Sequence, residues 1–256
     1  MMVKMSDGIG KIVEGYNSVI SALENNRVLE LVTLEKNIDS KKVKDLIEIA
    51  QQKKAKVTNI KSKNEWKFTS TEYVAALCKP KKIYNESDLK KFNTTNFIVC
   101  DHIQDTNNLG AIARSAASFD FNVMCVPERR SARLSERTFK ISSGGLEKIN
   151  ILEYKSIFSL LKKFQSLDVW TIGLDMYGVT DIQSLDLGSQ NLAFFIGSEE
   201  KGLSREIKNK LDNVVRIQMS KDIESLNVSV AAGIACLLYT SPSPRDVSRS
   251  RMPSSA

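Results

Sequence analysis

The sequence has few cysteines, and the four present are scattered along its 256 residues. Cys78, Cys100, Cys125 and Cys236 form no Cys-x-x-Cys pair, so their spacing predicts neither a zinc site nor a disulfide framework. We therefore predict no metal site. We also expect the chain to work in a reducing compartment, the cytoplasm.

Histidine is rarer still, because His102 is the only one in the chain. A hydrolase built on a Ser-His-Asp or Cys-His arrangement would have to use this residue, which lies beside Asp101 after the apolar run FIVC. We favour a structural role for it. The sequence also lacks a bilayer-spanning apolar run, an N-terminal signal core and a Gly-x-Gly-x-x-Gly fingerprint. These absences argue against a membrane partner and a dinucleotide site.

Positive charge is in excess, with 37 Lys and Arg against 30 Asp and Glu and a formal net charge of +7. Such a surface suits a polyanion such as RNA, because it neutralises phosphates and releases their counterions. A lysine-rich proteome would give the same count, so charge alone leaves both explanations open.

The apolar spacing predicts a small first unit and a larger second one. Up to about residue 80, GYNSVISALENN and DSKKVKDLIEIAQQKKA have helical spacing, and RVLELVTLE and KVTNIK have strand patterns between and after them, which predicts a small αβαβ unit. From Asn96 on, buried-type strands such as FIVC and NLAFFIG alternate with helices, which predicts a mostly parallel α/β sheet covered on both faces. We expect a small domain at 8–82, a linker at 83–94 and a larger domain at 95–239.

The last stretch, residues 240–256, holds three of the five prolines and almost no apolar side chains. Such a composition cannot offset the entropy of ordering, so we expect this tail to be disordered. The run CLLYTSPSPRD resembles translated adapter or vector sequence joined to a reading frame, in which case the natural C-terminus is missing. A natural basic arm is the alternative.

One stretch that packing alone does not explain is DHIQDTNNLGAIARSAASF. Asn108 is expected just before a helix and Arg114 one to two turns into it, so both could face one side of the helix start. The free N–H groups there and an arginine fork favour an anion. An ordinary Asn cap with an exposed arginine is the alternative.

Two further stretches lie at predicted strand ends. In FFIGSEEKGLSRE, a loop containing Gly197 and Gly202 follows a buried strand, where open α/β sheets bind ligands. A tight turn alone would also favour two glycines. In SLNVSVAAGIACLLY, we expect Ser225 to cap a helix and Asn227 to lie in its first turn.

Together these stretches resemble the signature motifs of the SpoU (TrmH) family of RNA 2′-O-ribose methyltransferases, in the SPOUT class. The motifs Asn-x-Gly…Arg, Gly-Ser-Glu-x-x-Gly-Leu and Ser-Leu-Asn-Val-Ser-Val-Ala occur in the family order between about Ile98 and Leu238. KISSGGLEKI resembles a further family segment. VEGYNSVISALENNRVLELV is similar to the ribosomal-L30e-like substrate-binding domain of many members, including those that methylate a guanosine of large-subunit rRNA. STEYVAAL departs from the His-Gln-Gly common in the rRNA enzymes, and Glu200 replaces a frequent Gly.

The resemblance implies a C-terminal α/β SPOUT domain with a deep trefoil knot, a preceding L30e-like domain, a homodimer and S-adenosyl-L-methionine (SAM) as cofactor. It implies catalytic or substrate-positioning roles for Asn108, Arg114, Glu199, Ser225 and Asn227. It implies cofactor contacts for Leu174, Gly197, Ser198, Ile217, Met219 and Leu226. For the family, the arginine that matches Arg114 has been proposed to accept or activate the proton. A phosphate-clamping and ribose-positioning role is chemically easier, because a guanidinium pKa is too high for a base. Glu199 is the only nearby carboxylate that the sequence offers as a general base.

We therefore predict a SAM-dependent 2′-O-methyltransferase that acts on RNA, most simply a guanosine of large-subunit (23S) rRNA, with no DNA partner. A tRNA guanosine, in the D-loop, is the second candidate substrate. A non-catalytic RNA-binding SPOUT protein is an alternative of another class. A nucleotide-binding enzyme on a doubly wound sheet is disfavoured by the missing glycine fingerprint.

Overall fold

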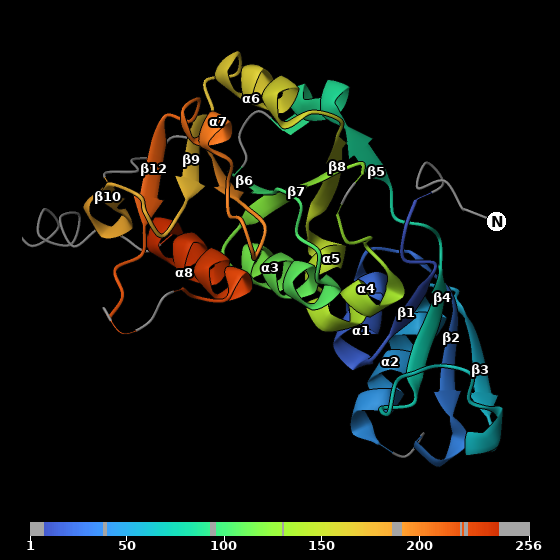
Figure 1. Cartoon of the computed structure of the whole chain (residues 1–256). Helices are drawn as coiled ribbons and strands as arrows, with labels where there is room; N and C mark the ends of the chain where they lie inside the picture. Colours follow the sequence, from blue (N-terminus) through green and yellow to red (C-terminus); the bar gives the residue numbers. More distant parts are fainter. Residues whose placement is uncertain are drawn as a thin grey trace, which may run out of the picture.

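The structure, a computed structural model, describes residues 8–37, 40–92, 96–129, 131–185, 191–220, 222 and 225–240. Two sheets divide these residues into two units (Figure 1). We call the four-stranded sheet with helices α1 and α2 the N-terminal unit, and the eight-stranded sheet with its helices the C-terminal unit. Within the described ranges, no helix is both long and apolar enough to cross a membrane.

The N-terminal unit has the strand order β1-β4-β2-β3. Its elements are β1 (Ile12–Glu14), α1 (Tyr16–Glu24), β2 (Val28–Leu34), α2 (Lys41–Gln52), β3 (Lys56–Ile60) and β4 (Val74–Cys78), with short helices η2 (Glu35–Asn37) and η3 (Lys63–Glu65). The two predicted helices and the predicted strands at β2 and β3 are confirmed. Strands β1 and β4, which pair antiparallel with each other, were not expected from the sequence.

The C-terminal unit has the strand order β10-β12-β9-β11-β6-β7-β8-β5, and each neighbouring pair is parallel. Its strands are β5 (Ile83–Asn85), β6 (Asn96–Cys100), β7 (Phe121–Pro127), β8 (Asn150–Tyr154), β9 (Trp170–Leu174), β10 (Thr180–Asp181), β11 (Leu192–Ile196) and β12 (Asn213–Arg216). Its helices are η4 (Glu86–Phe92), α3 (Thr106–Ser118), α4 (Glu136–Ser142), α5 (Gly145–Lys148), α6 (Ile157–Gln165), η5 (Ile182–Ser184), α7 (Arg205–Lys208) and α8 (Val228–Thr240). The predicted parallel α/β sheet is confirmed.

Helices cover both faces of this sheet, because its strands alternate their apolar side chains between two cores. In β11, Phe194 and Ile196 belong to the core under α3 and α8, whereas Phe195 belongs to the core under α6 and α7. This period of two is what a strand buried on both faces requires. Figure 1 shows α8, α3, α5 and α4 in a row along one face, and α6 and α7 on the other.

The structure differs from the predicted boundaries of the linker and the C-terminal tail. The segment expected to be a linker, residues 83–94, contains β5 and η4, and β5 pairs with β8 at the edge of the larger sheet. Thr240, expected to begin the tail, is the last residue of α8, and residues 241–256 lie outside the described residues. The domain limits and the trefoil knot stay predictions.

Candidate functional site

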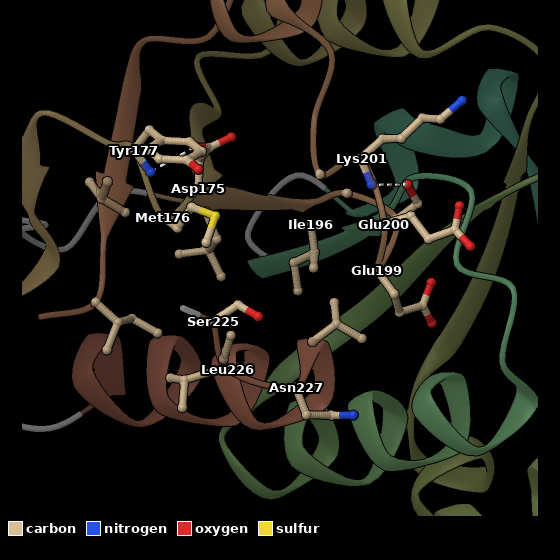
Figure 2. Close-up of a pocket in the computed structure, with 18 of the residues that line it drawn as sticks. Asp175, Met176, Tyr177, Ile196, Glu199, Glu200, Lys201, Ser225, Leu226 and Asn227 are labelled. Carbon is tan, nitrogen blue, oxygen red and sulfur yellow. Dashed lines mark hydrogen bonds between the residues drawn. The ribbon is translucent and has the colours of Figure 1, made fainter. Parts of the chain in front are cut away.

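The structure has a cavity of about 580 Å³ at the carboxyl edge of the larger sheet. The loops that follow β9, β11 and β12 and the start of α8 surround it (Figure 2). All six residues expected to contact a cofactor line it: Leu174, Gly197, Ser198, Ile217, Met219 and Leu226. Three of the five residues expected to act on the substrate line it too: Glu199, Ser225 and Asn227. Carboxyl ends of parallel strands are where open α/β sheets bind ligands.

The loop after β11 explains why the sequence places glycines at 197 and 202. A Cβ atom on Gly197 would lie 2.0 Å from the carbonyl carbon of Gly202, so the two backbones meet directly. Gly202 has φ +61°, in the left-handed region that favours glycine. Its N–H donates to the carbonyl of Ser198 at 2.9 Å and closes the turn. The tight turn and the ligand-binding loop are therefore the same feature, and it projects Glu199 from the sheet edge.

A chain of hydrogen bonds joins one residue from each of the three motifs. The amide Nδ2 of Asn108 donates to Glu199 Oε1 at 2.8 Å, and Nδ2 of Asn227 donates to Asn108 Oδ1 at 3.1 Å. Stretches that lie 91 and 119 residues apart in the sequence thus meet in one polar network. Asn108 is only 8% exposed, so it connects the other two from below the surface.

The structure corrects which residues cap the two helices of the site. Asp105, not Asn108, caps α3, since its carboxylate accepts from the N–H of Asn107 at 2.8 Å. Asn108 lies inside the first turn, which frees its amide for the network. At α8 the cap is Asn227 rather than Ser225, because Asn227 Oδ1 accepts from the N–H of Ser229 at 2.9 Å. Ser225 is exposed and lies two residues before the cap, on the wall of the cavity.

Arg114 does not share the surroundings of Asn108. The two are six residues apart, a rotation of about 240° around a helix, so they point to different sides of α3. Arg114 is exposed, does not line the cavity and has no partner for its guanidinium among the residues that the structure describes. The expectation that both face one side of the helix start is therefore wrong.

Three acidic residues line the cavity, although the sequence pointed to Glu199 alone. Asp175, directly after β9, forms an ion pair with Lys208 at 2.9 Å and its side chain is only 7% exposed. Its other oxygen accepts from the N–H of Tyr177 at 2.9 Å. Glu200 is exposed at the rim. The signal for Asp175 was an acidic residue directly after a buried strand, whereas Glu199 is the third residue after its strand.

Apolar side chains that the sequence did not single out complete the cavity. Ile196, Val215 and Val228 contribute to its wall, and Met176 lies beside Asp175 (Figure 2). Tyr177 lies at the rim with 82% of its surface exposed. The lining is thus mainly apolar with a few charged groups, as in sites for small organic ligands.

His102 lies near the site but outside the cavity lining. Its Nδ1 is 2.6 Å from Asp101 Oδ1, and Asp101 also accepts from the hydroxyl of Tyr154 at 3.2 Å. The backbone of His102 has φ +58°, a conformation that histidine tolerates better than most residues. These contacts agree with the structural role expected for it.

Nothing in the described part of the chain offers a metal site. No group of three or more His, Cys, Asp or Glu side chains there could hold a metal ion. The four cysteines are free and buried. Burial raises the pKa of the Cys78 and Cys236 thiols to about 12.

Known proteins similar to this chain agree on one family. The profile of the SpoU rRNA Methylase family matches residues 95–237, and that of RNA 2′-O ribose methyltransferase substrate binding matches residues 12–84. The 23S rRNA (guanosine-2′-O-)-methyltransferase RlmB of Xylella fastidiosa is 31% identical over 232 residues, 87% of this chain and 92% of that protein.

Solved structures share the fold. The SpoU methyltransferase AviRb from Streptomyces viridochromogenes superimposes with a TM-score of 0.76 at 19% identity, over 93% of this chain and 90% of that one. AviRb in complex with the cofactor AdoMet gives a TM-score of 0.70, at 19% identity and over 90% and 88% of the two chains. The predicted α/β SPOUT fold with a small preceding unit is thus confirmed, and the chain belongs to the SpoU rRNA methylase family.

Proposed function

We propose that this chain transfers a methyl group from SAM to the ribose 2′-oxygen of a guanosine in large-subunit rRNA. The observation that carries the proposal is the hydrogen-bonded network of Asn108, Glu199 and Asn227 at the edge of the cavity. Each of the three SpoU motifs contributes one member to it. The similarity to RlmB, whose name specifies a guanosine of 23S rRNA, supports the substrate.

The cavity fits SAM in size and chemistry. Its volume of about 580 Å³ is in the range of small-ligand sites. Leu174, Ile217 and Leu226 would form an apolar wall against the adenine ring. The carboxylates and ammonium groups around the same cavity suit the charged amino-acid end of the cofactor. When bound, SAM supplies an electrophilic methyl group on a sulfonium sulfur.

The residues around the cavity would align the ribose with that methyl group. Glu199 Oε1 accepts from Asn108, and Oε2 is 3.4 Å from the N–H of Gln104, so the carboxylate is held in one orientation. A fixed carboxylate is suited to accept the 2′-hydroxyl proton as the oxygen–carbon bond forms and the carbon–sulfur bond breaks. Asp175 is less suited, because Lys208 already occupies it. Ser225 would contact the ribose or the methionyl end from the opposite wall.

Arg114 would hold the RNA. An exposed guanidinium can bind a phosphate through two parallel hydrogen bonds and so position the adjacent ribose. Residues 12–84 match the substrate-binding profile of RNA 2′-O ribose methyltransferases, which supports an RNA-binding role for the N-terminal unit.

We also propose a homodimer working in the cytoplasm and the knotted topology of SPOUT proteins. Val230 and Leu237 on α8 are 49% and 46% exposed, which suits a second copy packing against this helix. The segment after β12 and the loop after β11 line the same cavity, which suits a chain crossing at this point. Sedimentation velocity of the purified protein would give the oligomeric state.

The test of the proposed function is tritium transfer from labelled SAM to total rRNA and, separately, to total tRNA. Label located at a 2′-O-methylguanosine of large-subunit rRNA is the expected result. Label confined to tRNA would replace the proposed substrate. SAM binding without transfer to either RNA would favour a non-catalytic RNA-binding protein.

A further inference from the structure

The N-terminal and C-terminal units are joined by a buried ion pair between Arg27 and Glu147. Arg27 lies between α1 and β2, and Glu147 lies on α5, 120 residues later. Their side chains are hydrogen-bonded, and the two residues are only 8% and 2% exposed. Charged side chains are rarely buried to this extent unless they are paired. The pair therefore depends on contact between the two units.

The guanidinium of Arg27 is fixed from the N-terminal side. Its Nε donates to the carbonyl of Lys79 at 2.9 Å, and its Nη2 donates to the carbonyl of Gly10 at 2.5 Å. Only Nη1 reaches across to Glu147. Because the planar guanidinium is already held by two backbone carbonyls, its remaining N–H group can donate in one direction only. Arg27 therefore defines where the carboxylate of the C-terminal unit must lie.

Two more N-terminal side chains converge on Glu147. Lys81 Nζ donates to its carbonyl oxygen at 3.0 Å, and Asn25 Nδ2 donates to the same oxygen at 3.3 Å. Burial lowers the pKa of Lys81 from its usual value, while the charge of Glu147 opposes this shift. The second carboxylate oxygen of Glu147 is buried and has no hydrogen-bond partner among the described residues. A displaced N-terminal unit would leave the buried side chains of Arg27 and Glu147 without partners, so one docked position is specified.

The same contact region reaches the site residue Arg114. Gly144 has φ +93°, and a Cβ there would lie 2.5 Å from Ser21 Oγ of α1. A Cβ on the next residue, Gly145, would lie 2.7 Å from the Cα of Arg114. One glycine pair thus touches the N-terminal unit on one side and the backbone of Arg114 on the other. A shift of α1 against this glycine pair would therefore move the backbone of Arg114.

We propose that Arg27 and Glu147 are positioning residues, which hold the N-terminal unit in a fixed place relative to Arg114 and the cavity. The inference rests on the proposed function, in which the N-terminal unit binds RNA and Arg114 holds the phosphate next to the target ribose. The two units then act as one rigid RNA-binding surface rather than as two domains on a flexible tether. RNA bound to the N-terminal unit is presented to the cavity in a single register.

The docking is tested without reference to activity by measuring a distance between the units. Gln52→Cys on α2 and Lys162→Cys on α6 place two exposed thiols for nitroxide labels. The native cysteines are buried, so the labels attach to the new thiols. Labelled protein is mixed with an excess of unlabelled protein before assembly, so that a dimer contains one labelled chain. Pulsed dipolar spectroscopy should then give one narrow distance distribution between the two units. The isosteric change Glu147→Gln should broaden it, because Arg27 is left buried without its counter-charge.

The matched control is Glu30→Gln. It removes a carboxylate from the pair with Lys56, which lies within the N-terminal unit and is partly exposed. This variant should keep the narrow distribution. Arg27→Gln should broaden it like Glu147→Gln, and the double variant should add little beyond either single change, since both act on one contact.

The kinetic arm separates positioning from folding. Glu147→Gln should lower kcat/KM for RNA by about 10-fold, since a small misplacement of a substrate has effects of this order or larger. The dissociation constant for SAM should stay within about twofold, because the cavity is lined by other loops. If Glu147→Gln lost both SAM binding and the circular dichroism signal of the folded protein, the ion pair would be needed for folding. That result would overturn the inference.

The distance measurement decides the inference even if the proposed function fails. A distribution in Glu147→Gln as narrow as in the parent would overturn it, and so would a broad one in the parent. Absence of methyl transfer in the parent, with the distances as expected, would instead refute only the proposed function and leave the docking intact.

Discussion

Asn108 and Arg114 lie on the same helix, yet their surroundings differ sharply. Asn108 is buried and hydrogen-bonded to Glu199 on one side and to Asn227 on the other. Arg114 is exposed, and no described residue partners its guanidinium. A held group binds without further ordering, whereas a free side chain loses rotamer entropy when a ligand orders it. In the proposed function, the cavity holds SAM and Arg114 holds RNA, and we call these the cofactor end and the RNA end. The cofactor end is then formed in advance, whereas the RNA end is completed by the substrate, and mutations should separate the two.

The largest separation is expected for Arg114→Ala. The variant should lower kcat/KM for RNA by about 10²–10³-fold, because loss of two charge-assisted hydrogen bonds to the phosphate would misplace the adjacent ribose. Titration with SAM should show an unchanged dissociation constant, because Arg114 does not line the cavity. Lys162→Ala, which removes an exposed cation from α6, is the control and should retain activity. Loss of SAM binding in Arg114→Ala would contradict the assignment of Arg114 to RNA binding.

Gly197→Ala should do the opposite and damage the cofactor end. Its new methyl group would meet the Gly202 backbone at 2.0 Å, so the loop must move. We expect SAM to bind about 5- to 150-fold more weakly, which corresponds to a distortion of about 1–3 kcal/mol. Gly202→Ala is the matched comparison, since its Cβ would have room, with Asp175 Oδ2 3.7 Å away, and would cost only the strain of φ +61°. Equal SAM binding by both variants would contradict this account of the turn.

The hydrogen-bonded network of Asn108, Glu199 and Asn227 should show energetic coupling. Asn108→Ala leaves polar groups of Glu199 and Asn227 without their partner, which should lower the free energy of unfolding by about 1–3 kcal/mol. Asn227→Ala should lower it by about 0.5–2 kcal/mol, because the change removes the cap of α8 together with the hydrogen bond to Asn108. Urea unfolding of the single and double variants gives the coupling, which we expect at roughly 0.5 kcal/mol or more. Strict additivity would mean that the network does not act as a unit.

The smallest effect is expected for Lys208→Met. The variant leaves Asp175 without the ammonium group that lies 2.9 Å away. Partly exposed ion pairs contribute roughly 0.2–1 kcal/mol, so SAM affinity should change by about two- to fivefold. Isothermal titration calorimetry against Lys210→Met, whose lysine does not line the cavity, isolates the contribution of the pair. A loss of SAM affinity as large as that of Gly197→Ala would mean that Lys208 binds SAM directly.

Most of the larger sheet could be predicted, because its strands carry long apolar runs between amphipathic helices. The elements missed were those that tertiary contacts create. Strand β5 has only three residues in a lysine-rich segment, and it is a strand because it pairs with β8. Strand β1 is equally short and pairs with β4. Such segments have no periodicity of their own to detect.

The loops of the site could be predicted from the sequence, but the orientation of several of its side chains could not. The motifs identified the loops, and the cavity contains all six expected cofactor contacts. The caps were misplaced because DTNN and SLN each offer more than one side chain able to cap a helix, and only the backbone conformation selects among them. The role of Asp175 was missed because its partner Lys208 is 33 residues away. The direction of Arg114 depended on where α3 begins.

The glycine pair at 144 and 145 has a consequence for recombining this protein with its relatives. A graft that replaces only the N-terminal unit would put a foreign surface against a turn with no side chains to adapt, and would leave Glu147 facing an unmatched residue. A cut inside residues 83–85 would also remove the edge strand of the larger sheet. The exchangeable module is therefore discontinuous. It comprises the N-terminal unit up to Lys82 together with residues 139–149, because Phe139 and Glu147 both contact that unit. Chimeras built on this block should keep the two units in their native positions.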